Sequence, residues 1–244
     1  MARRVVIILS ICVVAALVVG GVVVQRLVFG GTPVAQRPAV STTALGATPC
    51  ATFALSAGER GFALDSQHST AGYVAHFQAA GQPAPGAVNG VTGFVSGGFV
   101  LSPSPDPAIH SLKIQVDLRS LNSGAPPRDA HVRDDTFEVT RYPFATFVTE
   151  QSPTVAGTYV EGQSASFPLN GLLTIHGVTK PVTFAMTATL TGDTLTGVGA
   201  AQVKITDFGM KQPQITSDIP ITISNDIMLS INFVAHSTTC QSLP

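Results

Sequence analysis

The stretch of residues 170–190 places the strongest constraint on what this chain can fold into. Its second half alternates, with one parity occupied by the apolar residues Val182, Phe184, Met186, Ala188 and Leu190. Successive side chains of a strand point to opposite faces, so this half predicts a strand with one apolar face. Leu173 and Ile175 share a parity in the first half, and residues 176–181 between the halves, with Gly177 and Pro181, predict a turn. A hairpin alone is marginal in water, so more sheet must cover its apolar face.

Other segments alternate in the same way and supply that sheet. In residues 111–118 the apolar face carries Leu112, Ile114, Val116 and Leu118. In residues 195–205 the expected anchors are Leu195, Val198, Val203 and Ile205. Residues 221–233 form a further apolar parity that is interrupted at Asn225. The chain is therefore predicted to be all-β: a single antiparallel up-and-down, lipocalin-like barrel of about eight strands, closed so that it has no free edges, with a short helical insert near Asp129.

The N-terminus has a different character. Val5–Val24 contains twenty residues without a charge and follows Arg3 and Arg4. A helix of this length spans ~30 Å, the thickness of the bilayer's hydrocarbon core. The positive-inside tendency places the two arginines in the cytoplasm and the rest of the chain outside. We expect a transmembrane signal-anchor over residues 1–29, a flexible tether over 30–49 and a β-domain over 50–244 outside the cytoplasm; the alternative is a cleaved signal peptide and a secreted domain.

The net charge and the positions of the cysteines limit the kinds of partner and metal site that the protein can have. The 244 residues carry a net charge of −1, which argues against nucleic acid as a partner. Cys50 and Cys240 stand near the two ends of the β-domain, and we predict a disulfide between them, which would persist outside the cytoplasm. The cysteines and histidines show no spacing typical of a zinc site, and we expect no metal.

Several motifs, in order, resemble those of the YceI-like, polyisoprenoid-binding family, which has a lipocalin-like barrel. The resemblance covers roughly residues 62–233. It is carried by Asp65-Ser66-Gln67-His68-Ser69, the glycine-rich residues 93–99, the segments 128–137, 141–147 and 171–182, and Asp207-Phe208-Gly209-Met210. It implies an extended barrel with an internal apolar tunnel for an isoprenoid or similar amphiphile, such as a quinone, and no other cofactor.

Polar residues of the segment 128–137 are candidates for the tunnel mouth. Arg128, His131 and Arg133 would contact the ligand's head group, because guanidinium donors suit a pyrophosphate or a quinone carbonyl. The alternative is that the arginines pair with nearby aspartates at the surface or fix the helical insert to the barrel.

Aromatic residues are candidates for the tunnel wall around the ligand's tail. They are Phe137, Phe144, Phe147, Phe184 and Phe208, and each could instead serve plain core packing. Periodicity does not separate the two roles, since an eight-stranded barrel can hold either a side-chain core or a small ligand.

The expected function is that of an extracytoplasmic, membrane-tethered binding protein that holds an isoprenoid-type lipid in its barrel. A homodimer is compatible with this function. The chain lacks the common hydrolase and nucleotide-binding motifs, so we expect no enzyme. Two alternatives remain open at this point. An enzyme could present such a lipid to Asp129 and His131, and a structural or adhesion module would have a solid core.

Overall fold

The computed structural model describes residues 51–52, 55–102, 107–151, 160–213 and 220–241. The predicted signal-anchor and tether lie outside these residues, as does Cys50. Among the helices that fall within the described ranges, none combines the length and the apolar character needed to cross a membrane.

The described elements are mostly antiparallel strands. In chain order they are β1 (Ala51–Thr52), β2 (Arg60–Leu64), β3 (Thr70–Ala79), β4 (Gly86–Thr92), β5 (Val95–Leu101), β6 (Ile109–Asp117), the 3₁₀ turn η1 (Leu118–Ser120), α2 (Pro126–His131), the π-helical turn η2 (Val132–Thr136), β7 (Phe144–Gln151), β8 (Ser164–Ile175), β9 (Val178–Thr191), β10 (Thr194–Lys204), the 3₁₀ turn η3 (Ile205–Phe208), β11 (Ile221–Ser237) and β12 (Cys240–Gln241).

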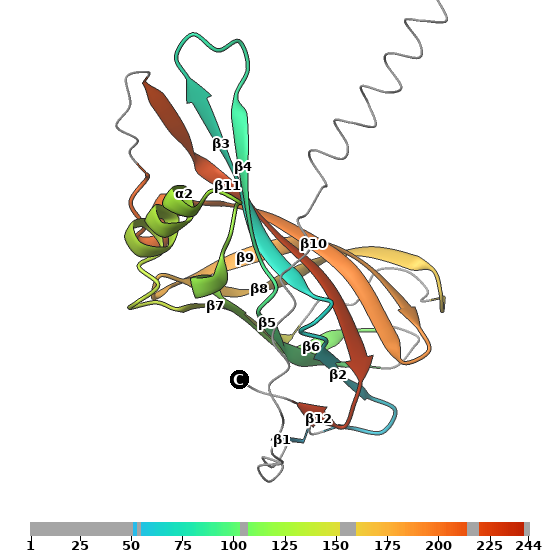
Figure 1. Ribbon diagram of the computed structural model, residues 1–244. Coiled ribbons are helices and arrows are strands. Elements are labelled where there is room, and N and C mark those ends of the chain that lie inside the picture. The colour runs from blue at the N-terminus through green and yellow to red at the C-terminus, as the bar shows by residue number, and fades with distance from the viewer. Residues whose placement is uncertain (1–50, 53–54, 103–106, 152–159, 214–219, 242–244) are drawn as a thin grey trace, which may run out of the picture. The chain divides into compact units, whose positions relative to one another are not determined.

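Eight of the described strands close into an antiparallel barrel, as the sequence predicts. Neighbours run β10-β9-β8-β7-β6-β5-β2-β11, and β11 returns to pair with β10 and close the ring (Figure 1). Helix α2 with η2 forms the helical insert between β6 and β7. Closure satisfies the edges that an open sheet would leave to other chains.

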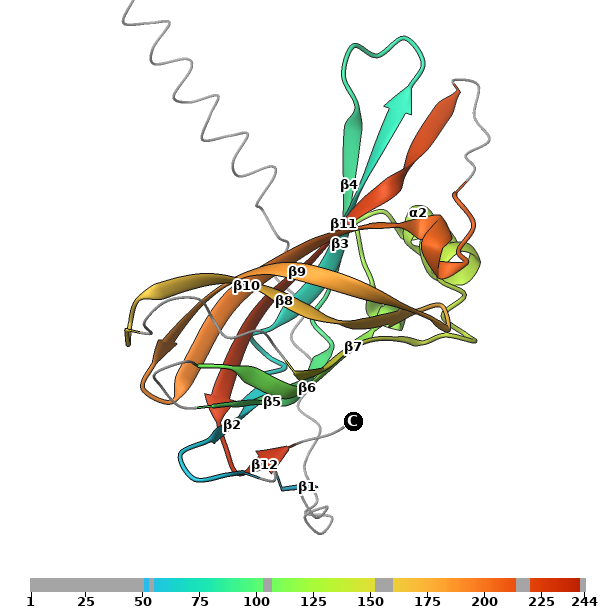
Figure 2. The same cartoon turned by 180° about the vertical axis from the view of Figure 1, so that it is seen from behind.

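The long strand β11 serves two parts of the sheet. Its C-terminal end pairs with β2, and its N-terminal end pairs with β3, which in turn pairs with β4. The register of β11 and β3 shifts between Ile223 and Ile227, around the Asn225 that interrupts the apolar parity in the sequence. Beyond this irregularity the β3–β4 hairpin and the start of β11 project from the barrel beside α2 (Figure 2).

The β8–β9 hairpin is confirmed, with a shorter turn than the sequence predicts. Ile175 pairs with Val178, so the turn is only His176-Gly177, both at positive φ. This is the backbone of a two-residue type I′ turn. Pro181 lies inside β9 and pairs with Leu172. The strand tolerates it because β10 pairs with β9 only from Ala185 onward, which leaves the Pro181 nitrogen at an effective edge.

The prediction that Val198 anchors the core is wrong. Val198 is 51% exposed, whereas Leu195, Ala201 and Val203 of the same strand are buried. The inward parity of β10 also includes Gly197 and Gly199. Because glycine carries no apolar side chain, the outward Val198 looks like the anchor when the sequence is read alone.

Part of the barrel interior is packed solid. Phe62 and Phe99 stack with their ring centroids 5.3 Å apart, and both are buried. Nearby, β1 and β12 pair through Thr52 and Cys240, which brings the two ends of the β-domain together. The Cys50–Cys240 disulfide remains a prediction, since Cys50 lies outside the described residues.

Candidate functional site

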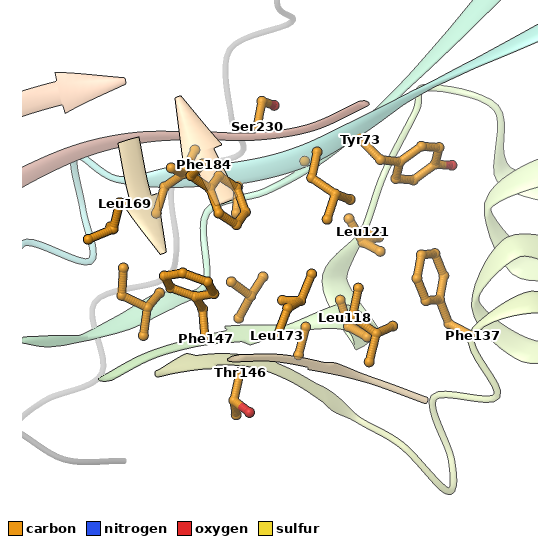
Figure 3. A pocket seen from close by; sticks show the side chains of 18 of the residues that line it. Tyr73, Leu118, Leu121, Phe137, Thr146, Phe147, Leu169, Leu173, Phe184 and Ser230 are labelled. Carbon is orange, nitrogen blue, oxygen red and sulfur yellow. The ribbon is translucent and has the colours of Figure 1, made fainter. Parts of the chain in front are cut away.

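The barrel also contains an apolar cavity of about 100 Å³, which we call the inner cavity. Its lining comes from strands β3, β6, β7, β8, β9 and β11 and is almost entirely apolar (Figure 3). The side chains around it include Ile114, Val116, Leu118, Leu121, Ala145, Phe147, Leu169, Leu173, Ile175, Phe184, Met186, Leu229 and Ile231. An apolar void of this kind repels water and suits a hydrocarbon chain.

Glycines on the inward face keep the large side chains close to the wall. A Cβ at Gly171 would collide with the Phe147 ring, and a Cβ at Gly197 would lie 2.7 Å from the Phe233 ring. Each ring therefore lies flat across the backbone of a neighbouring strand. Phe147 is further held by Phe184, at 5.1 Å between ring centroids in an edge-on arrangement. The interior stays hollow beside Phe147 because this ring occupies the space that a side chain at Gly171 would fill.

A second cavity of about 260 Å³, which we call the mouth cavity, adjoins the first. It lies between the β3–β4 hairpin, the start of β11, the helical insert and residues 205–213. Its lining includes Phe77, Val88, Arg128, His131, Val132, Thr136, Ile205, Met210, Pro213, Ile221, Ile223 and Ile227. Tyr73 and Phe137 line both cavities, and their ring centroids are 6.1 Å apart. These two rings form the junction between the inner cavity and the mouth cavity.

Of the three predicted head-group residues, two line a cavity and one does not. Arg128 and His131 line the mouth cavity. Arg128 donates from Nε to Ser123 Oγ at 2.9 Å and from Nη2 to the Ser123 carbonyl at 3.1 Å. Arg133 is absent from both linings and donates from Nη1 to the Leu121 carbonyl at 2.7 Å, which ties the insert to the barrel.

Of the five predicted tail residues, three line the inner cavity and two do not. Phe137, Phe147 and Phe184 line the inner cavity. Phe144 is 39% exposed, and the Arg119 guanidinium lies over its ring, 5.2 Å from the centroid. Phe208 is buried in the core but borders neither cavity.

Asp129 and His131, the pair that the enzyme alternative needs, have different partners. The buried carboxylate of Asp129 accepts hydrogen bonds from the backbone N–H of Ser123, at 2.9 Å, and from its hydroxyl. His131 Nδ1 lies 2.7 Å from the carboxylate of Asp135. In this arrangement the carboxylate stabilises the start of the insert, and the imidazole is paired with a different residue.

Tyr73 is the site residue that the sequence did not identify. Its hydroxyl belongs to a buried side chain at the junction. Burial raises the pKa of Tyr73, the negative charge of Asp129 raises it further, and the positive charge of Arg128 acts in the opposite direction. The signal available in the sequence is weak. Tyr73 is one of two large residues in a short strand, and it faces Gly90 across the β3–β4 pairing.

Two carboxyl groups outside the cavity linings have lowered pKa values. A hydrogen bond from His68 lowers the pKa of Asp65, helped by the backbone N–H of Gln67. The Arg119 guanidinium lowers the pKa of Asp117 through a hydrogen bond. No group of three or more His, Cys, Asp or Glu side chains in the described part of the chain is placed to hold a metal ion.

Known proteins resemble this chain in sequence over part of its length. A UPF0312 protein of Pseudomonas aeruginosa (strain LESB58) is 32% identical over 113 residues, which are 43% of this chain and 55% of the relative. A UPF0312 protein of Pseudomonas putida (strain W619) is 38% identical over 125 residues, 46% of this chain and 60% of the relative. The chain thus spans between 55% and 60% of the length of these curated relatives.

Two solved structures share the fold. A polyisoprenoid binding domain from Saccharophagus degradans superposes with a TM-score of 0.57 at 18% identity, covering 72% of this chain and 98% of that chain. BcnA from Burkholderia cenocepacia gives a TM-score of 0.52 at 22% identity, covering 70% and 98% respectively. Residues 62–235 match the family model described as the YceI-like domain. This match covers most of the closed barrel around the inner cavity, and the protein belongs to the YceI-like domain family.

Proposed function

We propose that this protein binds an isoprenoid or similar amphiphilic lipid, with the tail in the inner cavity and the head in the mouth cavity. The observation that carries the proposal is the hollow, almost wholly apolar interior, which meets a second cavity bordered by Arg128 and His131 at Tyr73 and Phe137. A packed barrel, as the structural or adhesion alternative requires, would have no such void. The polyisoprenoid binding domain of the same fold supports the choice of an isoprenoid-type tail.

Burial of the tail supplies enough free energy for this role. Each CH₂ group moved from water into an apolar site contributes ~0.8 kcal/mol. The inner cavity of about 100 Å³ holds about one isoprene unit, so a tail of a few units must also extend through the mouth cavity of about 260 Å³. A tail that occupies both gives affinities on the order of micromolar, after the costs of ordering the ligand are subtracted. Binding of this kind requires no chemical step from the protein.

The proposal places the β-domain outside the cytoplasm, tethered to the membrane by residues 1–29. Its support is the uncharged run Val5–Val24 behind Arg3 and Arg4. A tethered domain stays near the bilayer from which it takes the lipid. Alkaline extraction of membranes tests the tether, and protease digestion of intact cells tests the location. Release of the protein from membranes by alkali would contradict the tether. Protection of the β-domain from protease added to intact cells would contradict its location outside the cytoplasm.

The lipid itself is tested by analysis of what copurifies with the full-length protein. We would purify it in an amphipathic polymer, because detergent competes for an apolar cavity, and then apply native mass spectrometry and solvent extraction. The expected result is one bound amphiphile per chain, lost in a variant whose inner cavity is filled. Protein that carries no lipid, and takes up none from vesicles, would contradict the proposal.

A further inference from the structure

The outer edge of strand β4 is open. β4 ends the strand order of the large sheet, and Figure 1 and Figure 2 show it on the side of β3 away from β11. Val91 exchanges two backbone hydrogen bonds with Asn122, at 2.9 and 3.0 Å. Backbone groups alternate in direction along a strand, so Ala87 and Asn89 direct their N–H and C=O groups the same way, away from β3. Within the described ranges no backbone group bonds to them.

This open edge is short and has no feature that would repel another strand. On one side it ends at Pro85, which has no N–H, and on the other at Val91, whose groups are already bonded to Asn122. Natural edge strands are usually protected by charged side chains, prolines or bulges. Residues 86–92 contain no charged residue and no proline, and their register with β3 is continuous. The edge therefore suits a short partner strand.

The open residues are arranged symmetrically, which favours a second copy of the same strand. Val88 is flanked on each side by an open residue and then by a glycine, in the order Gly86-Ala87-Val88-Asn89-Gly90. In an antiparallel pairing with Val88 opposite its counterpart, Ala87 of each copy would face Asn89 of the other. Each of these two pairs would exchange both of its hydrogen bonds, so every open group of the edge would gain a partner. A longer foreign strand would gain no more, because the edge is closed at both ends.

Side chains on the mouth face of the hairpin also reach this edge. A Cβ at Gly86 would collide with the Phe77 ring, and a Cβ at Gly90 would collide with the Tyr73 ring. Both rings of β3 therefore lie across the backbone of β4. In the symmetric pairing Gly86 of one copy would face Gly90 of the other, so that apolar rings from both copies would flank the two Val88 side chains. Tyr73, Phe77 and Val88 all line the mouth cavity.

We propose that two copies of this chain pair antiparallel through the β4 edge, about a twofold axis at Val88. The pairing joins β11, β3 and β4 of each copy into one continuous sheet. The axis is perpendicular to this sheet, so the two mouth cavities lie on the same face and Val88 of each copy borders the cavity of the other. This interface goes beyond the proposed function, since it does not depend on which ligand the cavities hold.

A proline at the open edge tests the hydrogen bonds. Ala87→Pro removes an outward N–H from each copy and leaves the bonds between β3 and β4 intact. Sedimentation velocity of the full-length protein in an amphipathic polymer, from about 1 to 100 µM, should show a dimer that forms as the concentration rises. The dissociation constant should rise at least about tenfold in Ala87→Pro. Ala84→Pro is the matched control, because Ala84 is an exposed alanine in the loop before β4, and it should leave dimerisation unchanged.

A cysteine on the axis tests the register. Directly opposite residues of an antiparallel pair have Cβ atoms about 4.5–5.5 Å apart, so Val88→Cys should form a disulfide between two copies on mild oxidation. Val91→Cys is the control, since two copies of this residue would lie about 20 Å apart along the strands. The wild type controls for the native cysteines. Non-reducing gels of membranes that contain the full-length protein measure the cross-linked fraction, which should be high only for Val88→Cys.

Four results would overturn the proposal. They are a wild type that stays monomeric at about 100 µM, a dimer that Ala87→Pro does not weaken, cross-linking of Val91→Cys as readily as of Val88→Cys, and a native mass that shows a foreign peptide or protein on the chain in place of a second copy. None of them bears on the proposed function, because the copurifying lipid is measured separately and a monomer could hold it equally well.

Discussion

The inner cavity and the mouth cavity meet at the same two rings, yet they are built by different parts of the chain. Strands that alternate regularly surround the inner cavity, and nearly every side chain that faces it is apolar. The mouth cavity lies between a projecting hairpin and a helical insert, and Arg128 and His131 reach it. Under the proposed function, the barrel would hold the hydrocarbon tail, and the less regular segments would contact the head group.

Removing one aromatic ring from the lining of each cavity should give the largest difference in stability between the two regions. Phe147→Ala deletes a buried ring that packs on Phe184, and it should lower the free energy of unfolding by about 3 kcal/mol. Phe77→Ala removes a half-buried ring in the projecting hairpin and should cost less than about 2 kcal/mol. Urea unfolding followed by circular dichroism measures both. Equal losses would mean that the hairpin is as integral to the core as the barrel wall.

The insert depends on a polar anchor instead of a ring. Asp129→Ala leaves the backbone N–H and hydroxyl of Ser123 without their acceptor in a largely buried place, which should cost about 1–3 kcal/mol. Asp134→Ala is the control, since Asp134 is an exposed carboxylate of the same insert, and it should change stability by less than about 0.5 kcal/mol. The same unfolding experiment applies. A neutral Asp129→Ala would show that the insert is held by its apolar contacts alone.

The inner cavity could be predicted from the sequence more fully than the mouth cavity. Leu173 and Phe184 lie in strands whose alternation of apolar and polar residues shows which side chains face inward. The family motifs predict that these strands belong to one barrel. The roles of Tyr73 and Arg133 could not be predicted, because they depend on which strand or loop lies opposite. A single sequence does not report that Gly90 receives the Tyr73 ring, or that the Leu121 carbonyl accepts from Arg133.

Filling the inner cavity should separate ligand binding from stability. Ala145→Leu adds three carbons to a buried position in the cavity lining. Tail binding should weaken at least tenfold, about 1.4 kcal/mol, with little change in unfolding free energy because the new atoms occupy empty space. Ala185→Leu adds the same atoms to an exposed alanine on the outer face of β9 and serves as the control. If both variants bind a farnesyl-substituted benzoquinone like the wild type, the tail lies somewhere other than the inner cavity.

The smallest effect is expected where the barrel wall gives way to the insert. Asp117 ends β6, and its carboxylate bonds the Arg119 guanidinium, with Oδ2 2.7 Å from Nη2. Because this contact lowers the pKa of Asp117 from its ordinary 3.8, it stabilises the fold above that value, and the stabilisation is lost as the pH falls through the lowered pKa. Asp117→Asn keeps the acceptor for the backbone N–H of Arg119 and removes only the charge. At neutral pH the variant should be less stable by under about 1 kcal/mol, since Arg119 is largely exposed. Unfolding curves of wild type and variant should converge on acidification, and a difference that persists in acid would assign the effect to packing of Arg119 on Phe144 rather than to charge.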